Sequence, residues 1–181
     1  MGHRHSKQDL LDGAVALALE EGLAHLSFGR VARRAGVSDR IVVYYFPSRE
    51  VLVTEVFSQV AARLQTVLLS AFATPVTDHL DLIRTAWPVL AHPDADPVFA
   101  LYFEAAGMAV GGHAPFHTLV PELVRSWVSW AAELLPGSAP HRTREAEAAI
   151  ALIDGLLLLR QLLGPQPAAR AFSALTAAEV E

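Results

Sequence analysis

The apolar positions of this chain recur at spacings of three and four residues, which is the period of one face of an α-helix. The first such segment, residues 6–21, has an apolar stripe made of Leu10, Leu11, Ala14, Val15, Ala18 and Leu19. Gly22 follows as a typical helix stop. No stretch alternates apolar and polar residues between hairpin turns, so the pattern predicts an all-α fold.

Two short helices are predicted next. Ser27 is a favourable N-cap for a helix that ends near Ala35, and Gly36 can take the left-handed conformation that stops it. Ser38 caps the following helix, which Pro47 ends. Two short helices joined by such a tight turn have the spacing of a helix-turn-helix.

Longer helices are predicted in the rest of the chain. Ser48 caps one that runs to about Ala73. The others are near residues 78–90, 96–109, 121–135 and 143–163, with a short helix after Pro167. The breaks HPDADP, GGHAP, PGSAP and GPQP are rich in turn-forming residues. We therefore expect a three-helix head, residues 1–48, on a helical body, residues 49–181.

The composition allows a folded core and narrows the chemistry. Hydrophobic residues make up 52% of the chain, which is enough to fill such a core. There is no cysteine, which excludes a disulfide framework, a thiolate metal site and a cysteine nucleophile, and favours a reducing compartment. Charges, glycines or prolines interrupt the apolar runs before they reach membrane-spanning length. We expect a cytoplasmic protein that does not enter a membrane.

The charge is unevenly distributed. Residues 1–50 carry seven Lys and Arg against six Asp and Glu, whereas the remainder carries seven against thirteen, for a net charge of -5. Between residues 28 and 49 the chain has one acid, Asp39, and five arginines: Arg30, Arg33, Arg34, Arg40 and Arg49. A basic segment suits a nucleic-acid partner, but arginines on solvated helix faces give the same composition. Composition alone leaves both interpretations open.

The short helix after Ser38 offers side chains for DNA binding at both of its ends. Arg40, in its first turn, can pair in bidentate fashion with the two acceptors of guanine. Tyr44 and Tyr45 present phenolic donors suited to phosphate oxygens, and Arg49 adds a positive charge at the start of the next helix. One end of the helix is therefore expected to read bases and the other to hold the DNA backbone. The residues expected to face inward are Ile41, Val42 and Phe46.

The segment LSFGRVARRAGVSDRIVVYYFPSREVL, within residues 10–57, resembles the DNA-binding signature of the tetracycline-repressor-like (TetR) transcriptional regulators. The resemblance lies in a Ser-capped helix, an AGVS turn, a helix that ends in aromatic residues, and a basic residue that opens the fourth helix. It implies a homodimeric regulator, most often a repressor, that binds a palindromic operator in double-stranded DNA and is released by a small-molecule effector. The DNA contacts that it implies are Ser27, Ser38, Arg40, Tyr44, Tyr45 and Arg49.

The chain departs from the family pattern at four positions. Gly29 stands where many members have a basic or polar residue, and Ile41 and Val43 replace a common threonine and a common tyrosine. Asp39 lies near phosphate, accepts from a cytosine amino group, or favours its own helix N-terminus, and we prefer the last. These departures leave open a helical interaction protein that has lost DNA binding.

The last long helix is predicted to form a dimer interface. Residues 148–163 are apolar on nearly every side, interrupted by Asp154 and Arg160, and Gly155 would let another helix approach closely. The resemblance implies a four-helix bundle between two chains at this helix. Burial inside the core of a monomer is the alternative.

The resemblance also implies a cavity in the body for an apolar or amphipathic effector. Its candidate lining residues are Trp87, Phe99, Tyr102, Phe103, Glu104 and Trp127, with Phe57, Phe116 and His117 as further candidates. Each of them can equally be ordinary core, because aromatic residues at helical spacing usually pack against one another. Tyr102 and Glu104 are favoured as contacts because a buried polar group needs a partner.

No motif predicts catalysis, a metal or a cofactor. His113 and His117 have the spacing of a helical metal pair, but Pro115 lies between them and glycines precede them, which indicates a loop. No glycine-rich phosphate loop or Gly-x-Ser-x-Gly sequence occurs, and the order of serines, histidines and acids indicates no catalytic triad. We therefore do not expect an enzyme, and an enzyme with its chemistry in the helical body is the remaining alternative.

Overall fold

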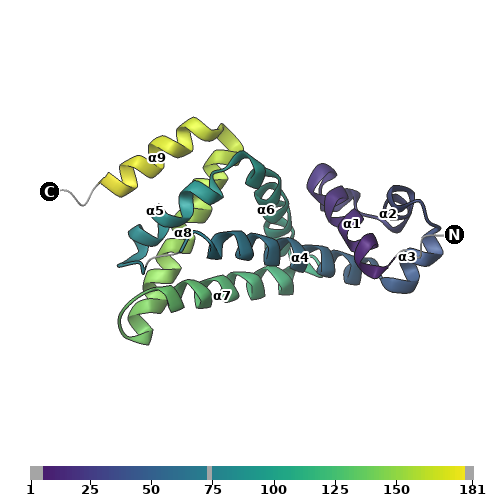
Figure 1. Ribbon diagram of the computed structural model, residues 1–181, viewed down its shortest axis with the longest axis horizontal. Helices are drawn as coiled ribbons and strands as arrows, with labels where there is room; N and C mark the ends of the chain where they lie inside the picture. Colours follow the sequence, from purple (N-terminus) through teal and green to yellow (C-terminus); the bar gives the residue numbers. More distant parts are fainter. Residues whose placement is uncertain (1–5, 73–74, 178–181) are drawn as a thin grey trace. The chain divides into compact units, whose positions relative to one another are not determined.

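The computed structural model describes residues 6–72 and 75–177, and this part of the chain contains helices and no strands (Figure 1). The helices are α1 (Lys7–Glu21), η1 (Leu23–His25), α2 (Phe28–Ala35), α3 (Asp39–Tyr45), α4 (Arg49–Leu69), α5 (His79–Leu90), η2 (Pro93–Ala95), α6 (Asp96–Val110), α7 (Phe116–Leu134), α8 (Ala139–Leu163) and α9 (Pro165–Ala177). The two η elements are single turns of 3₁₀-helix. The prediction of an all-α fold is confirmed.

The chain divides into two compact units. Unit 1 comprises Met1–Arg63 and Ala100–Val120, and unit 2 comprises Leu64–Phe99 and Pro121–Glu181. Helices α4, α6 and α7 each contribute residues to both units. The predicted boundary after residue 48 lies within unit 1, and separate folding of the segment before it stays a prediction.

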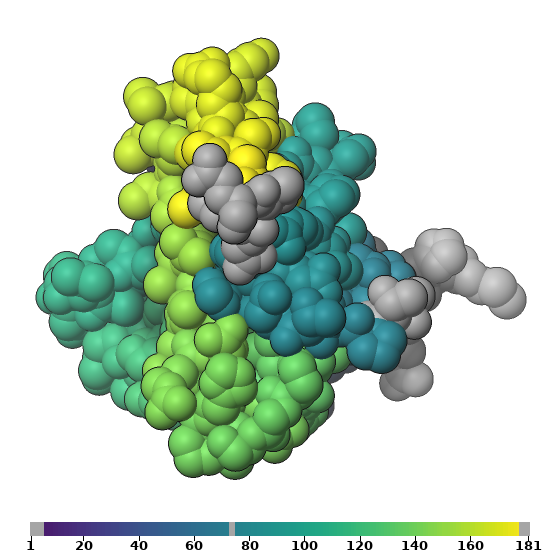
Figure 2. All heavy atoms as spheres, turned by 90° about the vertical axis from the view of Figure 1, so that its left-hand side faces the viewer, coloured from purple at the N-terminus to yellow at the C-terminus, as the bar shows by residue number. Residues whose placement is uncertain are grey.

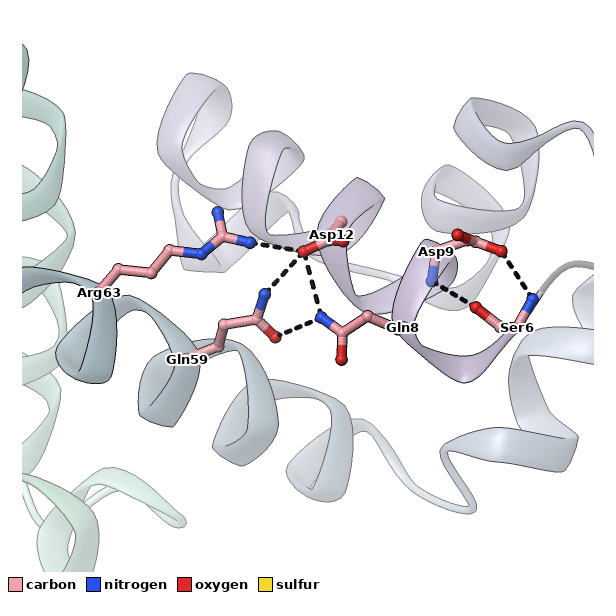
Figure 3. Close-up of polar contacts among 6 residues, drawn as sticks. All are labelled: Ser6, Gln8, Asp9, Asp12, Gln59 and Arg63. Carbon is pink, nitrogen blue, oxygen red and sulfur yellow. Dashed lines mark hydrogen bonds and ion pairs between the residues drawn. The ribbon is translucent and has the colours of Figure 1, made fainter. Parts of the chain in front are cut away.

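Helix α1 begins as its sequence predicts. The Ser6 hydroxyl accepts a hydrogen bond from the Asp9 backbone N–H at 3.1 Å, and the Asp9 carboxylate accepts from the Ser6 N–H at 2.8 Å (Figure 3). This capping box satisfies two backbone donors that the first turn leaves free. The helix buries the predicted stripe except Leu19, which is half-buried, and packs on α2.

The α2 to α3 connection has the geometry of a tight turn. Ser27 and Ser38 are the N-caps of α2 and α3, each with extended backbone and without a side-chain capping hydrogen bond. Gly36 has φ 68° and ψ 31°, and its N–H bonds back to the Ala32 and Arg33 carbonyls. This left-handed conformation confirms the predicted end of α2, because it strains any residue with a side chain.

We expect Gly36→Ala to lower the free energy of unfolding by about 1 kcal/mol. A Cβ at residue 36 would meet no atom within 4 Å, so the cost is backbone strain and not a steric clash. Gly13→Ala is the matched control, because Gly13 lies inside α1 and also has nothing within 4 Å of its Cβ position. It should raise stability by about 0.5–1 kcal/mol. Urea unfolding measures both changes in the free energy of unfolding. A change of the same sign in the two variants would contradict a left-handed conformation at Gly36.

Three helices begin earlier than predicted, and in each case a proline was given the wrong position. Helix α7 begins at Phe116 and contains Pro121, α8 has Pro140 in its first turn, and α9 begins at Pro165. Pro140 and Pro165 lie in the first turn of their helices, where proline is tolerated, whereas Pro121 lies inside α7 beyond its first turn. The position of a proline in the sequence therefore does not fix the first residue of a helix. Helix α4 ends at Leu69, and the predicted end at Ala73 lies outside the described residues.

Unit 2 is held together by packing of α5 and α9 against α8. In the space-filling view α8 forms a column, with α5 beside it and α9 at one end (Figure 2). The Trp87 ring stacks on Phe172 with centroids 5.2 Å apart, and Arg84 donates to the Thr176 carbonyl at 3.0 Å. At the other end of α5, His79 Nδ1 lies 2.6 Å from the Glu145 carboxylate and lowers the pKa of Glu145.

Helix α4 is the one helix in the described part of the chain that is long and apolar enough to cross a membrane. Its most apolar window has a mean hydropathy of 1.2, and 33% of that window is buried inside the protein. The core helix of a soluble protein meets the same conditions of length and composition. The property is therefore weak evidence for a membrane span.

Candidate nucleic-acid interface

Helix α3 is anchored by the buried side chains of Val42 and of its C-cap, Phe46, and it exposes most of the rest of its surface. Val42 and Phe46 have no exposed side-chain area, and they lie four residues apart on the face toward the core. Ile41 is 40% exposed, so its predicted inward orientation is wrong. Successive residues of an α-helix are about 100° apart around its axis, so Ile41, which precedes the anchored Val42, points away from the buried face.

The outer surface of α3 contains polar groups at both ends. Arg40 is exposed and has no hydrogen-bond or ion-pair partner in the part of the chain that the structure describes. At the other end, Tyr44 is 78% exposed and Tyr45 is half-buried, and their rings meet edge to face with centroids 5.0 Å apart. This packing fixes the direction of the Tyr44 ring and leaves it in contact with solvent.

Two of the five arginines of the basic segment are paired with acids of α1. Arg34 makes two hydrogen bonds of 2.6 Å with the Glu20 carboxylate, and Arg30 pairs with Glu21. The hydrogen bond from Arg34 holds the pKa of Glu20 below its usual value. The charge count from residue 28 onwards missed these acids because they precede the segment. The head is therefore less positive than its arginines indicate, and Arg40 contributes a larger share of the available charge.

Arg49 is oriented by the connection between α1 and α2. Its Nε donates to the Leu26 carbonyl at 3.1 Å, and its Nη2 donates to the Leu23 carbonyl at 3.0 Å. The residue lies in the first turn of α4, which Ser48 caps by accepting from the Val51 N–H at 3.2 Å. Arg49 therefore combines an exposed charge with a fixed direction.

Asp39 lies in the first turn of α3 and close to the start of α2. A Cβ built on Gly29 would be 3.4 Å from Asp39 Oδ2, so the carboxylate approaches the backbone of α2 closely. A negative charge at the N-terminus of a helix is favourable. Its place in the first turn of α3 agrees with the interpretation that Asp39 favours the N-terminus of its own helix.

A row of polar contacts joins α1 to α4 (Figure 3). The Asp12 carboxylate accepts hydrogen bonds from Gln8 at 3.2 Å, from Gln59 at 2.7 Å and from Arg63. The side chains of Asp12 and Arg63 are about half exposed, so each contact contributes little by itself. The row could not be predicted from the sequence, because residues spaced by four on two helices become neighbours only after the helices dock.

The residues of this segment match a known family. Residues 10–56 match the sequence model described as bacterial regulatory proteins, tetR family. Residues 10–56 are a tetR-family segment. The TetR resemblance is thereby confirmed, and the segment covers α1, α2 and α3 and the beginning of α4. No protein in the curated set matches the chain.

The fold of the whole chain is also that of TetR-family transcriptional regulators. A transcriptional regulator from Rhodococcus sp. Rha1 has a TM-score of 0.77 at 20% identity, over 96% of this chain and 95% of that one. A TetR transcriptional regulator from Legionella pneumophila has a TM-score of 0.71 at 17% identity, over 100% of both chains. The multidrug binding protein EbrR, solved with proflavin, has a TM-score of 0.66 at 21% identity, over 94% and 98%.

The residues predicted to line an effector cavity are divided between the two units. Trp87, Phe99 and Trp127 belong to unit 2, and Tyr102, Phe103 and Glu104 belong to unit 1. Of the further candidates, Phe57 and Phe116 are buried and His117 is exposed. In the described residues no group of three or more His, Cys, Asp or Glu side chains could hold a metal ion.

Several of these candidates have packing partners. Trp87 is buried in the stack with Phe172 described above, and Phe99 is 4% exposed. Trp127, with Gln65, Leu68 and Trp130, surrounds a void too narrow for a water molecule. Glu104 accepts hydrogen bonds from the backbone N–H groups of Leu23 and Ala24. These residues make the contacts that are expected of ordinary core packing. Their role as ligand contacts stays a prediction.

Unit 2 has an open groove of about 770 Å³ between α7 and α8. Its apolar lining includes Val128, Ala132, Ile150 and Ala151, and its charged lining includes Arg125, Glu133, Arg142 and Glu147. Beside it, α8 exposes a stripe of small and apolar residues: Ala151, Gly155, Leu158 and Leu162. Burial of α8 on every side within one chain is therefore wrong.

Proposed function

We propose that the protein is a homodimeric transcriptional regulator that represses by binding an inverted-repeat operator and is released by a small-molecule effector. The observation that carries this proposal is Arg40, exposed and unpaired in the described residues, on the first turn of an α3 that Val42 and Phe46 hold in place. This helix lies in the tetR-family segment. A short helix fixed in this way suits insertion into a major groove.

The proposed DNA contacts have different roles. Ser38 and Arg40 would face base edges, since they lie at the N-terminal end of the recognition helix. Tyr44 and Tyr45 would bind phosphate through their hydroxyls, and Ser27 and Arg49 would bind further phosphates. Ser27 suits this role because its hydroxyl makes no capping hydrogen bond. Arg49 suits it because two carbonyls already direct its guanidinium.

The proposed dimer interface is the stripe of α8 together with the α7–α8 groove. Exposed Leu158 and Leu162 would be removed from water by a second copy, and Gly155 would allow the close approach of its helix. A two-fold interface brings the same patch together with itself, so a groove that contains Arg125 and Glu133 can be complementary to its own copy.

The proposed effector is an apolar or amphipathic small molecule that contacts some of Trp87, Phe99, Tyr102, Phe103, Glu104 and Trp127. The EbrR relative solved with proflavin supports an aromatic ligand. If the effector favours a conformation unsuited to the operator, it must weaken DNA binding, and DNA must weaken effector binding by the same factor.

We further propose that the protein acts in the cytoplasm, where the chromosomal DNA of a bacterium lies, and that it is no enzyme. A helical interaction protein without DNA binding is the second candidate. It is favoured by the pairing of Arg30 and Arg34 with Glu21 and Glu20, which removes positive charge from the head.

The test is selection of bound duplexes from a random pool, followed by titration of the selected and of a scrambled duplex at several salt concentrations. Regulators of this kind should select an inverted repeat and bind it with an affinity that falls steeply with salt. Failure to enrich any sequence, with no salt-dependent binding, would favour the second candidate.

Arg49→Ala should weaken binding to selected and scrambled duplexes alike, and should lower the salt slope by roughly one for each protomer on the DNA. The physical reason is that a phosphate contact carries no sequence information. Arg33→Ala is the matched control, because Arg33 is exposed in the last turn of α2 and lies outside the proposed contacts. An equal loss of slope in the control would mean that the general charge of the head, and not a contact at Arg49, is responsible.

A further inference from the structure

We propose that Glu104 is a positioning residue for DNA binding, which acts through the Leu23–Ala24 peptide group on Arg49 without touching DNA. The inference rests on the proposed DNA-binding function. It assigns to one carboxylate of α6 the task of holding the connection between α1 and α2 in the shape that DNA binding needs.

The contact is a carboxylate that accepts two backbone hydrogen bonds. Glu104 Oε2 accepts from the Leu23 N–H at 2.8 Å, and Oε1 accepts from the Ala24 N–H at 2.8 Å. These two donors belong to the first turn of η1, where no earlier carbonyl of the helix is available to them. A carboxylate that binds two such donors forms strong, charge-assisted hydrogen bonds.

The same peptide group also binds Arg49. The peptide between Leu23 and Ala24 donates its N–H to Glu104 and accepts, at its C=O, a hydrogen bond of 3.0 Å from Arg49 Nη2. One amide therefore lies between an anion and a cation, and each hydrogen bond polarises the amide in the sense that strengthens the other. The second Arg49 contact, to the Leu26 carbonyl at 3.1 Å, holds the other end of the connection.

The connection is shaped to admit the carboxylate. A Cβ built on Gly22 would lie 2.9 Å from Glu104 Oε2, which is closer than a real side chain is found. Gly22 also has φ 87°, a conformation that strains other residues. The backbone conformation at residue 22 favours glycine, and the absence of a Cβ there also leaves room for the carboxylate to reach the two N–H groups.

The connection leads directly into the proposed DNA-binding residues. Ser27, a proposed phosphate contact, follows Leu26 and caps α2, and Arg49 takes its direction from the two carbonyls of the connection. Without the carboxylate, the N–H groups of Leu23 and Ala24 lose their partner and the connection gains freedom. DNA binding would then have to order it, and that ordering weakens the observed affinity.

Glu104→Gln tests the role, because the two possible effects have opposite signs. Loss of a negative charge by itself reduces repulsion from DNA and strengthens binding. Loss of the positioning contact weakens it, and we expect the dissociation constant for the selected duplex to rise about tenfold. Glu122→Gln is the control, because Glu122 is an exposed acid of α7 without a hydrogen-bond or ion-pair partner among the described residues. This variant should bind DNA as well as or slightly better than the unmodified protein.

Two further measurements separate positioning from a general loss of stability. Hydrogen exchange at the Leu23 and Ala24 amides should accelerate in Glu104→Gln, while exchange in the α1 core stays unchanged. In an Arg49→Ala background, the effect of Glu104→Gln on DNA affinity should shrink to less than half, because the path through Arg49 is gone. If Glu104→Gln does not fold, Gly22→Ala is the second variant, and it should weaken DNA binding to a similar extent.

The outcomes distinguish this inference from the proposed function. Unchanged or stronger binding of the selected duplex by Glu104→Gln, or an undiminished effect in the Arg49→Ala background, overturns the role of Glu104 alone. If the unmodified protein selects no duplex, the proposed function fails and the role fails with it.

Discussion

Gly155→Arg should convert the protein from a dimer into a monomer at micromolar concentration. Gly155 lies in the middle of the exposed stripe of α8, and a Cβ at that position meets no atom of its own chain within 4 Å. The variant is therefore expected to fold, because the arginine points into solvent in the monomer. In a dimer it would bury two symmetry-related charges next to Leu158 and its copy.

The expected loss is large. Burial of an unpaired charge costs about 3–5 kcal/mol, so the dissociation constant of the dimer should rise by a factor of at least about 100. Sedimentation equilibrium measures this change. Ala169→Arg is the control, since it places the same side chain on the exposed surface of α9, outside the stripe. A monomeric unmodified protein, or a dimeric Gly155→Arg variant, would contradict the proposed interface.

Arg40→Ala should cost about 1–3 kcal/mol of binding free energy per half-site on the selected duplex, with much less loss on a scrambled one. Arg40 combines charge, reach and a planar group that matches the two acceptors of guanine, and it is free of internal partners in the described part of the chain. Ser38 has a short side chain, and Asp39 is negatively charged and close to Gly29. Arg40 is therefore the best candidate for base recognition on α3.

The measurement is a pair of titrations for each variant, with selected and scrambled duplexes at several salt concentrations. Arg40→Lys keeps the charge and loses the bidentate geometry, so it should recover binding to the scrambled duplex but not the preference for the selected one. An equal loss on both duplexes for Arg40→Ala would make Arg40 a phosphate contact. The division of α3 into an end that reads bases and an end that holds the backbone would then be wrong.

Effects that act within a few residues could be predicted from the sequence. The end of α1 at Gly22, the left-handed Gly36 and the end of α3 before Pro47 depend on contacts within one turn, and each is present as predicted. The early starts of α7 and α8 were missed for a related reason. Pro140 lies in the first turn of α8, whereas Pro121 lies inside α7 beyond its first turn, and the local sequence does not choose between such positions.

Which side of a helix is buried depended on its neighbours. The sequence showed that residues 148–163 are apolar on nearly every side, but it could not show that Ile153 and Leu157 face the core while Gly155 and Leu158 stay exposed. For α3 the sequence predicted an inward Ile41, because Ile41 is apolar. The sequence does not show which face of a short helix packs against its neighbours. Docking of the helix decides this, and docking is a property of the whole unit.

The sequence by itself therefore determined that this protein is helical, where the turn between α2 and α3 lies, and that it resembles TetR regulators, because period, caps and motif are local. Only the tertiary structure decided how the charges are used. Arg34 and Glu20 are joined by a salt bridge between two helices, and Glu104 reaches Ala24 across 80 positions of sequence. The free energy of such contacts depends on distances that the fold creates, and no local pattern encodes those distances.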